Sequence, residues 1–159
     1  MSLREDLDPL RQLKFSNESN AAILNAAAKA YREWHPFVTT GHLLLGLWLV
    51  DGISAAVLRE FNITTASIEM ELLANHITIQ ADVVDVKPSH TMRRLFNKMV
   101  WDTRQKRELF IGTEDLLLAL VNYPQWPGLN FLKSAGADVI TVQATVVSLL
   151  AQVESKSKT

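Results

Sequence analysis

One phrase of the sequence occurs twice, and this repeat restricts the fold more than any other feature. The stretch FVTTGHLLLGLW begins at Phe37 and the stretch FIGTEDLLLALV begins at Phe110, with leucines at matching places. Such internal similarity is typical of a fold built from copies of one supersecondary unit. Both stretches are almost continuously apolar, so a helix formed by either has almost no polar face and must be surrounded by other elements. We therefore expect each copy to form the buried central helix of its own half.

The repeat extends beyond the leucine-rich phrase in both directions. Ser16 and Ser89 each precede a long segment whose apolar residues recur at helical spacing, which indicates an amphipathic helix in each half. Downstream, Thr64 aligns with Asp138 after a one-residue slip that we place in the loop at 122–128. Both residues are good helix N-caps, because their side-chain oxygens accept hydrogen bonds from free backbone N–H groups. Thr39 or Thr40 and Thr113 are the expected caps of the leucine-rich helices.

The last segment of the second half is ambiguous on its own. The stretch VITVQATVV is rich in β-branched residues and by itself fits a strand. Its place in the repeat favours a helix, because an amphipathic helix is expected at the same point of the first half. The apolar positions on that helix are Val142, Val146, Leu149, Leu150 and Val153, and those of its counterpart include Ile68, Leu72 and, on the same face, His76.

These patterns predict an all-α fold, an eight-helix bundle made of two pseudo-symmetric four-helix repeats. We expect 1–159 to form a single domain, with the first repeat at 15–77, a connector at 78–88 and the second repeat at 89–153. A chain of 159 residues is long enough to bury one good core or two small ones.

The residue types that carry chemistry form no recognisable reaction centre. The absence of cysteine excludes disulfides, thiol catalysis and sulfur-bound zinc. The four histidines have none of the spacings that let two ligands share a helix face with a metal. Gly41 and Gly46 have the spacing of a phosphate-binding loop, but Leu47 and Trp48 stand where lysine and a hydroxyl residue are needed. We predict a protein that is not an enzyme and binds no metal, nucleotide or other cofactor.

Overall charge and hydropathy give no sign of a membrane or nucleic-acid partner. A net charge of -1 and a pI near 6.4 provide no general attraction to polyanions. The longest apolar run, LLLGLWLV, is far shorter than the roughly 20 residues of a membrane-spanning helix. The opening MSLREDLDPL has acids and a proline where a signal peptide has its apolar region. We expect a cytoplasmic monomer that contacts no membrane.

Two local features offer candidate contact surfaces. Arg93 and Arg94 begin a basic cluster that fits a docking face for an acidic protein or nucleic acid. The cluster also fits the solvated side of an amphipathic helix, an interpretation that we favour, and we expect no nucleic-acid partner. In the loop YPQWPGLNF, Trp126 either anchors a partner peptide or fills the gap beneath the third helix of its half, and the sequence leaves both open.

The doubled unit resembles the N-terminal domain of the Clp ATPases. The resemblance rests on a helix opened by Ser or Thr, an aromatic residue, the phrase I-G-T-E-H-L-L-L-G-L, a short loop and two further helices, all present twice. The second copy departs from that phrase mainly at Asp115 and Ala119. The first copy retains His42 but has Thr39 and Gly41 where the family has Gly and Glu.

The resemblance covers about residues 15–153 and implies a non-catalytic module that binds substrates and adaptor proteins. Family members leave ATP hydrolysis to rings that follow this domain, whereas only ESKSKT follows Val153 here. We therefore expect either an excised N-terminal domain or a stand-alone accessory protein, and the extra segment 1–14 favours the second. The leading hypothesis is an accessory or adaptor of a Clp chaperone-protease, with Clp ATPase or protease subunits and substrate proteins as partners.

An alternative hypothesis is a receptor for substrates marked with phosphoarginine. In ClpC-like members the Glu of the repeated phrase helps to hold this mark, and here Glu114 with Thr113 keeps that pattern while Gly41 has no carboxylate for a guanidinium. Glu114 is also explained without a ligand, since an acid in the first turn of a helix stabilises it by about 0.3 to 1 kcal/mol. Asp115 adds to the same negative charge. The candidate protein- or ligand-binding residues are Thr113, Glu114, Asp115, Thr40, Trp126, Arg93 and Arg94.

Overall fold

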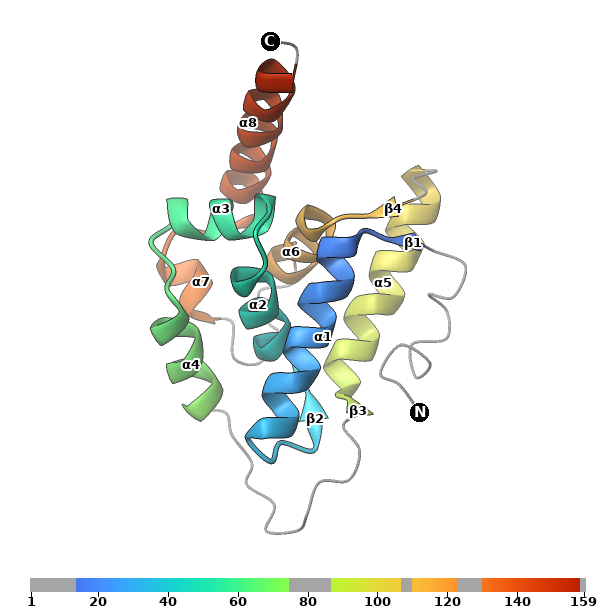
Figure 1. Ribbon diagram of the computed structural model, residues 1–159, viewed down its shortest axis with the longest axis vertical. Coiled ribbons are helices and arrows are strands. Elements are labelled where there is room, and N and C mark those ends of the chain that lie inside the picture. Colours follow the sequence, from blue (N-terminus) through green and yellow to red (C-terminus); the bar gives the residue numbers. More distant parts are fainter. Residues whose placement is uncertain (1–13, 75–86, 107–109, 123–129, 158–159) are drawn as a thin grey trace.

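The computed structural model describes residues 14–74, 87–106, 110–122 and 130–157, and helices make up most of this part of the chain (Figure 1). The first half contributes α1 (Asn17–Arg32), α2 (Thr40–Leu49), α3 (Ile53–Glu60) and α4 (Thr65–Ala74). The second half contributes α5 (His90–Lys106), α6 (Thr113–Asn122), α7 (Asn130–Ser134) and α8 (Val139–Ser157). Within the described residues, the predicted all-α fold with eight helices is confirmed, including the helical state of the ambiguous stretch at Val139.

The two leucine-rich helices lie at the centre of the core, as the repeat predicts. Leu43, Leu44 and Leu47 of α2 are fully buried, and so are Leu116, Leu117 and Leu120 of α6. Leu49, the last residue of α2, is half exposed. The helix ends there and the chain turns by 100° into α3, so this last side chain leaves the core. Among the described residues, no single helix is long and apolar enough to span a membrane.

α1 and α2 approach each other closely because Gly46 has no side chain. A Cβ atom at Gly46 would collide with the backbone carbonyl of Ala22 on α1, and it would also crowd the amide of Ala26. Ala22 and Ala26 are themselves completely buried. Small residues on both helices therefore set how closely the two helices pack.

The described residues also contain four short strands, which the helical patterns do not predict and which join the two halves. β1 (Lys14–Phe15) pairs in parallel with β4 (Phe110–Ile111), and β2 (Phe37–Val38) pairs in parallel with β3 (Lys87–Pro88). The two pairs lie at opposite ends of the molecule in Figure 1. The last two residues of the predicted connector at 78–88 form β3 and pair with β2. Each pair takes one strand from each half, so neither half completes its own pairing.

Helix starts in the two halves follow the same hydrogen-bonding scheme. The N–H of Ser16 donates to the carbonyl of Ile111 at 3.0 Å, and the N–H of Ser89 donates to the carbonyl of Val38 at 2.9 Å. Each serine hydroxyl also accepts from a backbone N–H three residues on, at 3.1 Å. The two serines thus cap α1 and α5 while they extend the strand pairs, which confirms their predicted role at the start of each segment.

N-caps are also predicted for α2, α4, α6 and α8, and three of these four predictions are confirmed. Thr64 and Asp138 accept from N–H groups in the first turns of α4 and α8. Thr39, rather than Thr40, caps α2, and the ring of His42 accepts in return from the Thr39 N–H at 3.0 Å. The prediction for Thr113 is wrong, because α6 begins at Thr113 itself and the preceding glycine takes the cap position.

A half-buried lysine joins α1 to α4. The ammonium of Lys29 pairs with Glu33 on its own helix and lies 2.9 Å from Oε1 of Glu69 on α4. Burial by itself lowers the pKa of Lys29, but the hydrogen bonds to the two glutamates raise it more, so the pKa lies above its ordinary value of 10.5. On α4, the predicted apolar face is confirmed at Ile68 and Leu72, which are buried. His76, the third residue predicted on this face, lies outside the described residues.

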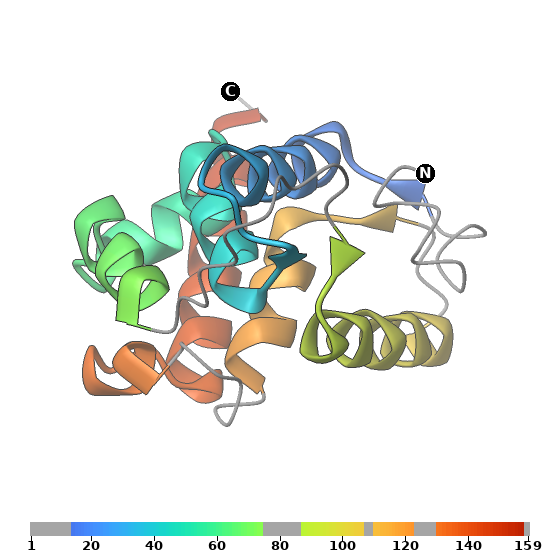
Figure 2. The same cartoon turned by 90° about the horizontal axis from the view of Figure 1, so that it is seen from below.

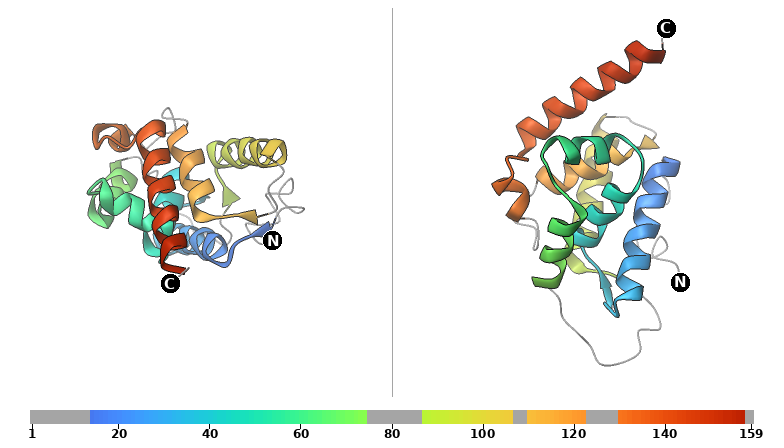
Figure 3. Two further views of the ribbon diagram at one scale, coloured as in Figure 1. Left: turned by 90° about the horizontal axis from the view of Figure 1, so that it is seen from above. Right: turned by 60° about the vertical axis from the view of Figure 1, so that its left-hand side comes forward.

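α8 leaves the body of the molecule in its second half. Val142 and Val146 are buried where α8 packs on α3 and α6, and Leu149 is half-buried. From Leu150 onward the described side chains are exposed, including Val153, so the predicted apolar face is only partly covered. Figure 3 shows this end of α8 extending past α3 and away from the other helices.

Candidate protein-binding site

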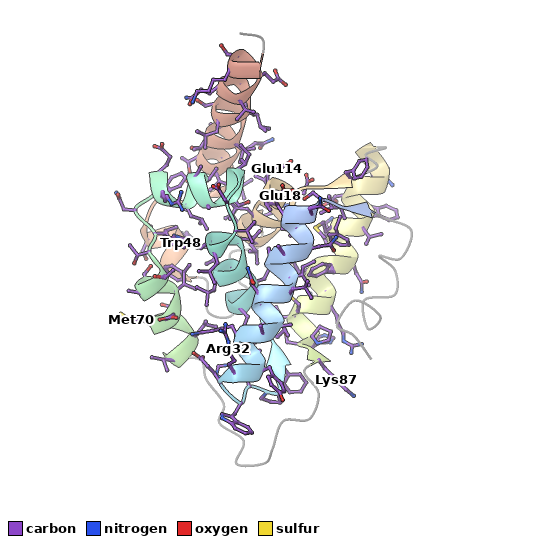
Figure 4. All side chains as sticks on the ribbon, in the orientation of Figure 1. Glu18, Arg32, Trp48, Met70, Lys87 and Glu114 are labelled. Atoms are coloured by element: carbon purple, nitrogen blue, oxygen red, sulfur yellow. The ribbon has the colours of Figure 1, made fainter. Side chains whose placement is uncertain are left out.

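An open pocket of about 710 Å³ lies between the two halves at the upper end of the molecule. Its walls come from the start of α1, the turn from α2 to α3, the start of α6 and the projecting part of α8. Figure 4 shows Glu18 of α1 and Glu114 of α6 next to one another at this end. The lining side chains include the acids Glu18, Asp51 and Glu114 and the apolar residues Ile53, Ala56, Phe110, Leu149 and Val153.

The Glu114 side chain lies over the backbone at the start of α6. A Cβ atom at Gly112 would lie 2.5 and 2.6 Å from the two carboxylate oxygens of Glu114, so the side chain folds back over this glycine. The carboxylate therefore stays beside the first turn of α6, where the helix dipole favours negative charge. A side chain at position 112 would displace the carboxylate at the flexible end of Glu114.

Thr113 lies in the wall of the same pocket. Its side chain is 5% exposed, and its hydroxyl oxygen is 3.5 Å from the position that a Cβ of Gly52 would occupy. Gly52 also lines the pocket, so Thr113 faces the turn between α2 and α3. Thr113 and Glu114, the candidate ligand-binding pair of the second copy, thus line one site.

Asp115 has a structural role instead. Its Oδ2 accepts a hydrogen bond from the Gly112 N–H at 2.9 Å, which satisfies a free donor at the start of α6. This contact is the counterpart of the one that His42 makes with Thr39 in the first half. Asp115 is not among the residues that line the pocket.

The equivalent place in the first half is closed. A Cβ atom at Gly41, the counterpart of Glu114, would lie only 2.9 Å from a methyl carbon of Leu72 on α4. Thr40, the counterpart of Thr113, is 1% exposed and lies in the core, so the structure gives it no surface for a partner. Of the two pseudo-equivalent places, the one in the second half is therefore open and carries a carboxylate.

The pocket has a strongly negative lining. Glu18, Asp51 and Glu114 contribute three carboxylates, while Lys156 is the cation among the lining residues. Carboxylates that share a concave surface raise the local concentration of positively charged groups and repel negative ones. The chemistry of this lining fits a lysine or arginine side chain with apolar neighbours.

The remaining candidates lie elsewhere. Arg93 and Arg94 are exposed on α5, which lies on the opposite side of the molecule from α3 and α4 (Figures 1 and 2). Buried residues such as Leu95 and Phe96 alternate with them, and Lys98 pairs with Asp102 at 3.6 Å. This arrangement agrees with the solvated side of an amphipathic helix. Trp126 lies outside the described residues, as do the side chains of the more distal basic residues of the cluster.

Sequence reasoning missed two of the three carboxylates. Glu18 and Asp51 lie outside the repeated stretches that define the pattern, and neither has a neighbour in the sequence that indicates a ligand. They meet Glu114 because α1 and the turn after α2 both pack beside the start of α6. A carboxylate at the start of α1 is explained locally by the helix dipole, so no signal in the sequence pointed to the pocket.

The fold and the pocket together define the class of protein: an all-α protein built from a doubled helical unit, with an open acidic pocket between the two halves. The family model of the Clp repeat (R) N-terminal domain matches residues 14–135. The chain belongs to this family.

Curated relatives are much longer than this chain. The chain is 28% identical over 142 residues to an ATP-dependent Clp protease ATP-binding subunit ClpA homolog of Porphyra purpurea, covering 87% of this chain and 17% of the relative. It is 27% identical over 148 residues to the ATP-binding subunit ClpC of Staphylococcus epidermidis, covering 91% of this chain and 18% of the relative. The similarity therefore concerns less than a fifth of either relative.

Solved structures share the fold. The Hsp104 N-terminal domain from Candida albicans superposes with a TM-score of 0.69 at 16% identity, covering 86% of this chain and 91% of that one. The N-terminal domain of the chaperone ClpD from Arabidopsis thaliana gives a TM-score of 0.65 at 21% identity, covering 86% and 97%. At these identities the comparison concerns the arrangement of the helices.

Proposed function

We propose that this chain is a non-catalytic protein-binding module that serves a Clp chaperone-protease in the cytoplasm as an accessory or adaptor. Its partners are Clp ATPase or protease subunits and the substrate proteins that they process. Family membership supports this proposal, together with relatives that are named ATP-binding subunits of an ATP-dependent Clp protease. In this function the module contributes docking, assembly or substrate delivery.

The observation that carries the proposal is the open pocket with its acidic and apolar lining. Glu18, Asp51 and Glu114 offer charge-assisted hydrogen bonds to a basic side chain. Phe110 of β4 and Val153 of α8 are both more than half exposed at the same pocket, and they offer apolar area to neighbouring side chains of a partner. A partner segment with a lysine or arginine between apolar residues meets both requirements.

A second candidate function is recognition of phosphoarginine, and the shared position of Thr113 and Glu114 favours it. The guanidinium of such a mark suits Glu114. The phosphate, however, would lie among three carboxylates, and like charges in one pocket oppose each other. We therefore propose that the pocket receives an unmodified basic side chain. Titration with two peptides of one sequence, with and without phosphate on the arginine, separates the candidates, because each predicts the opposite order of affinity.

The partner class is tested by affinity capture from a lysate of the source organism. The wild-type chain is expected to recover Clp subunits, and Glu114→Lys is expected to recover far less because it reverses the charge at the pocket. Glu60→Lys is the matched control, since Glu60 is an exposed glutamate at the end of α3 and does not line the pocket. Recovery of no Clp subunit from a lysate that contains them contradicts the proposal, as does equal capture by Glu114→Lys.

A further inference from the structure

A second surface, at the end of the molecule opposite the acidic pocket, carries exposed aromatic side chains. Tyr31 in the last turn of α1, Trp34 just after it and Phe37 of β2 are 57%, 54% and 49% exposed. They lie within seven residues of sequence, on the segment that joins α1 to α2. Aromatic residues are enriched at protein interfaces because each buries a large apolar area with little loss of side-chain freedom.

The backbone at Trp34 is strained. Its φ is 59°, in the left-handed region that disfavours residues with a Cβ atom. The strain comes from the way α1 ends: the Trp34 N–H donates to the Tyr31 carbonyl at 3.2 Å, and the His35 N–H donates to the Ala30 carbonyl at 2.8 Å. This pair of bonds is the Schellman motif, in which glycine usually holds the left-handed position.

Among the helix ends that the structure describes, two others form the same motif, with residues that suit the left-handed position. After α3 the left-handed position is Asn62 with φ 57°, and after α7 it is Gly136 with φ 84°. Tryptophan at the equivalent point of α1 costs roughly 1 kcal/mol relative to glycine. A strained position that carries a large exposed side chain is typical of a recognition site, since fold stability by itself favours glycine there.

Two cations flank the aromatic residues. Arg32 is exposed in the last turn of α1, two residues before Trp34. Lys87 pairs with Phe37 across β2 and β3, and both side chains are exposed from these paired positions. Figure 4 shows Arg32 and Lys87 at the same lower end of the molecule. The nearby acids Glu33 and Glu69 share Lys29, so these three residues together keep a negative charge, and Arg32 and Lys87 leave the described surface around the aromatic residues positive on balance.

We propose that Tyr31, Trp34 and Phe37, together with Arg32 and Lys87, form a docking surface for an acidic segment of a second protein that carries an apolar side chain. The aromatic rings provide the buried area, and the two cations provide complementary charge that speeds association and rejects basic segments. This surface is opposite in charge to the pocket at Glu114. The two ends of the molecule therefore select partners of different chemistry, and this inference does not depend on the proposed function.

The charges also argue against a second copy of this chain as the occupant. A symmetric dimer places the same patch of both copies face to face. Arg32 and Lys87 of one copy would then meet the same cations of the other, and Glu33, which shares Lys29 with Glu69, offsets only part of this charge. Such a contact is opposed by like-charge repulsion.

The decisive variant is Trp34→Gly, because it removes the anchor and relieves the strain together. A random peptide library displayed on phage is selected on the wild-type chain after depletion on Trp34→Gly. We expect the selected peptides to combine Asp or Glu with Leu, Phe or Trp. We also expect Trp34→Gly to melt at a higher temperature than the wild type, which shows that its loss of binding is not a loss of fold.

Charge is tested on a synthetic copy of a selected peptide by fluorescence anisotropy. Arg32→Glu and Lys87→Glu are each expected to weaken binding by about tenfold or more. Lys133→Glu on α7 and Trp101→Ala on α5 are the matched controls, since both residues are exposed away from this surface, and they are expected to leave binding unchanged.

Three results overturn the proposal. The first is selection of basic peptides, or of none that depend on Trp34. The second is a lower melting temperature for Trp34→Gly, which gives the tryptophan a structural role. The third is self-association of the wild-type chain in sedimentation that Trp34→Gly removes, which makes a second copy the occupant.

Discussion

At the scale of single residues, acidic side chains at helix starts have two different roles, and the role depends on the position of the residue in the first turn. Asp138 and Asp115 bind free backbone N–H groups at helix starts, whereas Glu114, one residue before Asp115, is folded into the pocket. The Asp138 carboxylate accepts from the Thr141 N–H at 2.8 Å and from the Thr141 hydroxyl at 3.1 Å. These bonds stabilise its charged form and lower the pKa of Asp138 below its ordinary value of 3.8.

Asp138→Ala is expected to lower the melting temperature at neutral pH, because α8 loses its cap. The folded pKa lies below the unfolded value, so the contribution of the charge is fully present above the unfolded value and is lost as the pH falls through the folded one. The difference in melting temperature between wild type and variant, followed by circular dichroism, should therefore shrink below pH 3.8. Asp138→Asn is the control, since it keeps an acceptor without the charge. A difference that stays constant in acid contradicts this explanation.

At the scale of helices and strands, the two halves have the same order of elements but pack differently. Gly46 brings α2 against Ala22 of α1, whereas the repeat places Ala119 and Leu95 at the equivalent positions of α6 and α5. The final helices differ more in the part of the chain that the structure describes, where α8 has 19 residues and α4 has 10. The additional length of α8 supplies one wall of the acidic pocket, while Leu72 of α4 covers the equivalent place at Gly41.

Gly46→Ala is expected to destabilise the fold by about 1–3 kcal/mol, because the new methyl group meets a backbone carbonyl that moves only if α1 shifts. Urea unfolding followed by circular dichroism measures the effect as a lower midpoint. Ala119→Gly is the matched change in the other half, and we expect it to cost about 1 kcal/mol through helix propensity alone. An unchanged midpoint for Gly46→Ala shows that the helices are not in close contact at this glycine.

At the scale of the whole molecule, the halves depend on one another for both fold and site. Each strand pair takes one strand from each half, and the serine caps of α1 and α5 bond to carbonyls of the opposite half. The acidic pocket is shared in the same way, with Glu18 and Asp51 from the first half and Glu114 from the second. Neither the strand pairs nor the pocket exists within one repeat.

Residues 1–77 and 78–159, produced as separate chains, are therefore not expected to fold alone. Each would leave its strands unpaired and one side of its central helix in water, which opposes folding of so short a chain. Thermal melts by circular dichroism should show no cooperative transition for either part, with the full chain as the reference. A cooperative melt of one part near the melting temperature of the full chain would show that the repeats are independent.

Much of the helical architecture could be predicted from the sequence, because it depends on interactions within a few residues. Apolar periodicity identifies the helices, Ser16, Thr64 and Asp138 are confirmed as caps, and the repeated phrase locates the two buried central helices. The repeat also decided the state of the last helix, whose β-branched residues by themselves favour a strand. These features need no knowledge of which segments meet in space.

The sequence by itself therefore determined the doubled helical plan, its caps and its two central helices. The tertiary structure alone decided the strand pairs, the acidic pocket and the exposed aromatic surface. Two-residue strands have no periodicity to detect, and Glu18 and Glu114 are far apart in the chain until α1 packs beside α6. The apolar stripe of α8 is the same in sequence whether it is covered or projects into solvent. Local patterns record which backbone state is stable, whereas the surfaces that bind partners arise from contacts between distant segments.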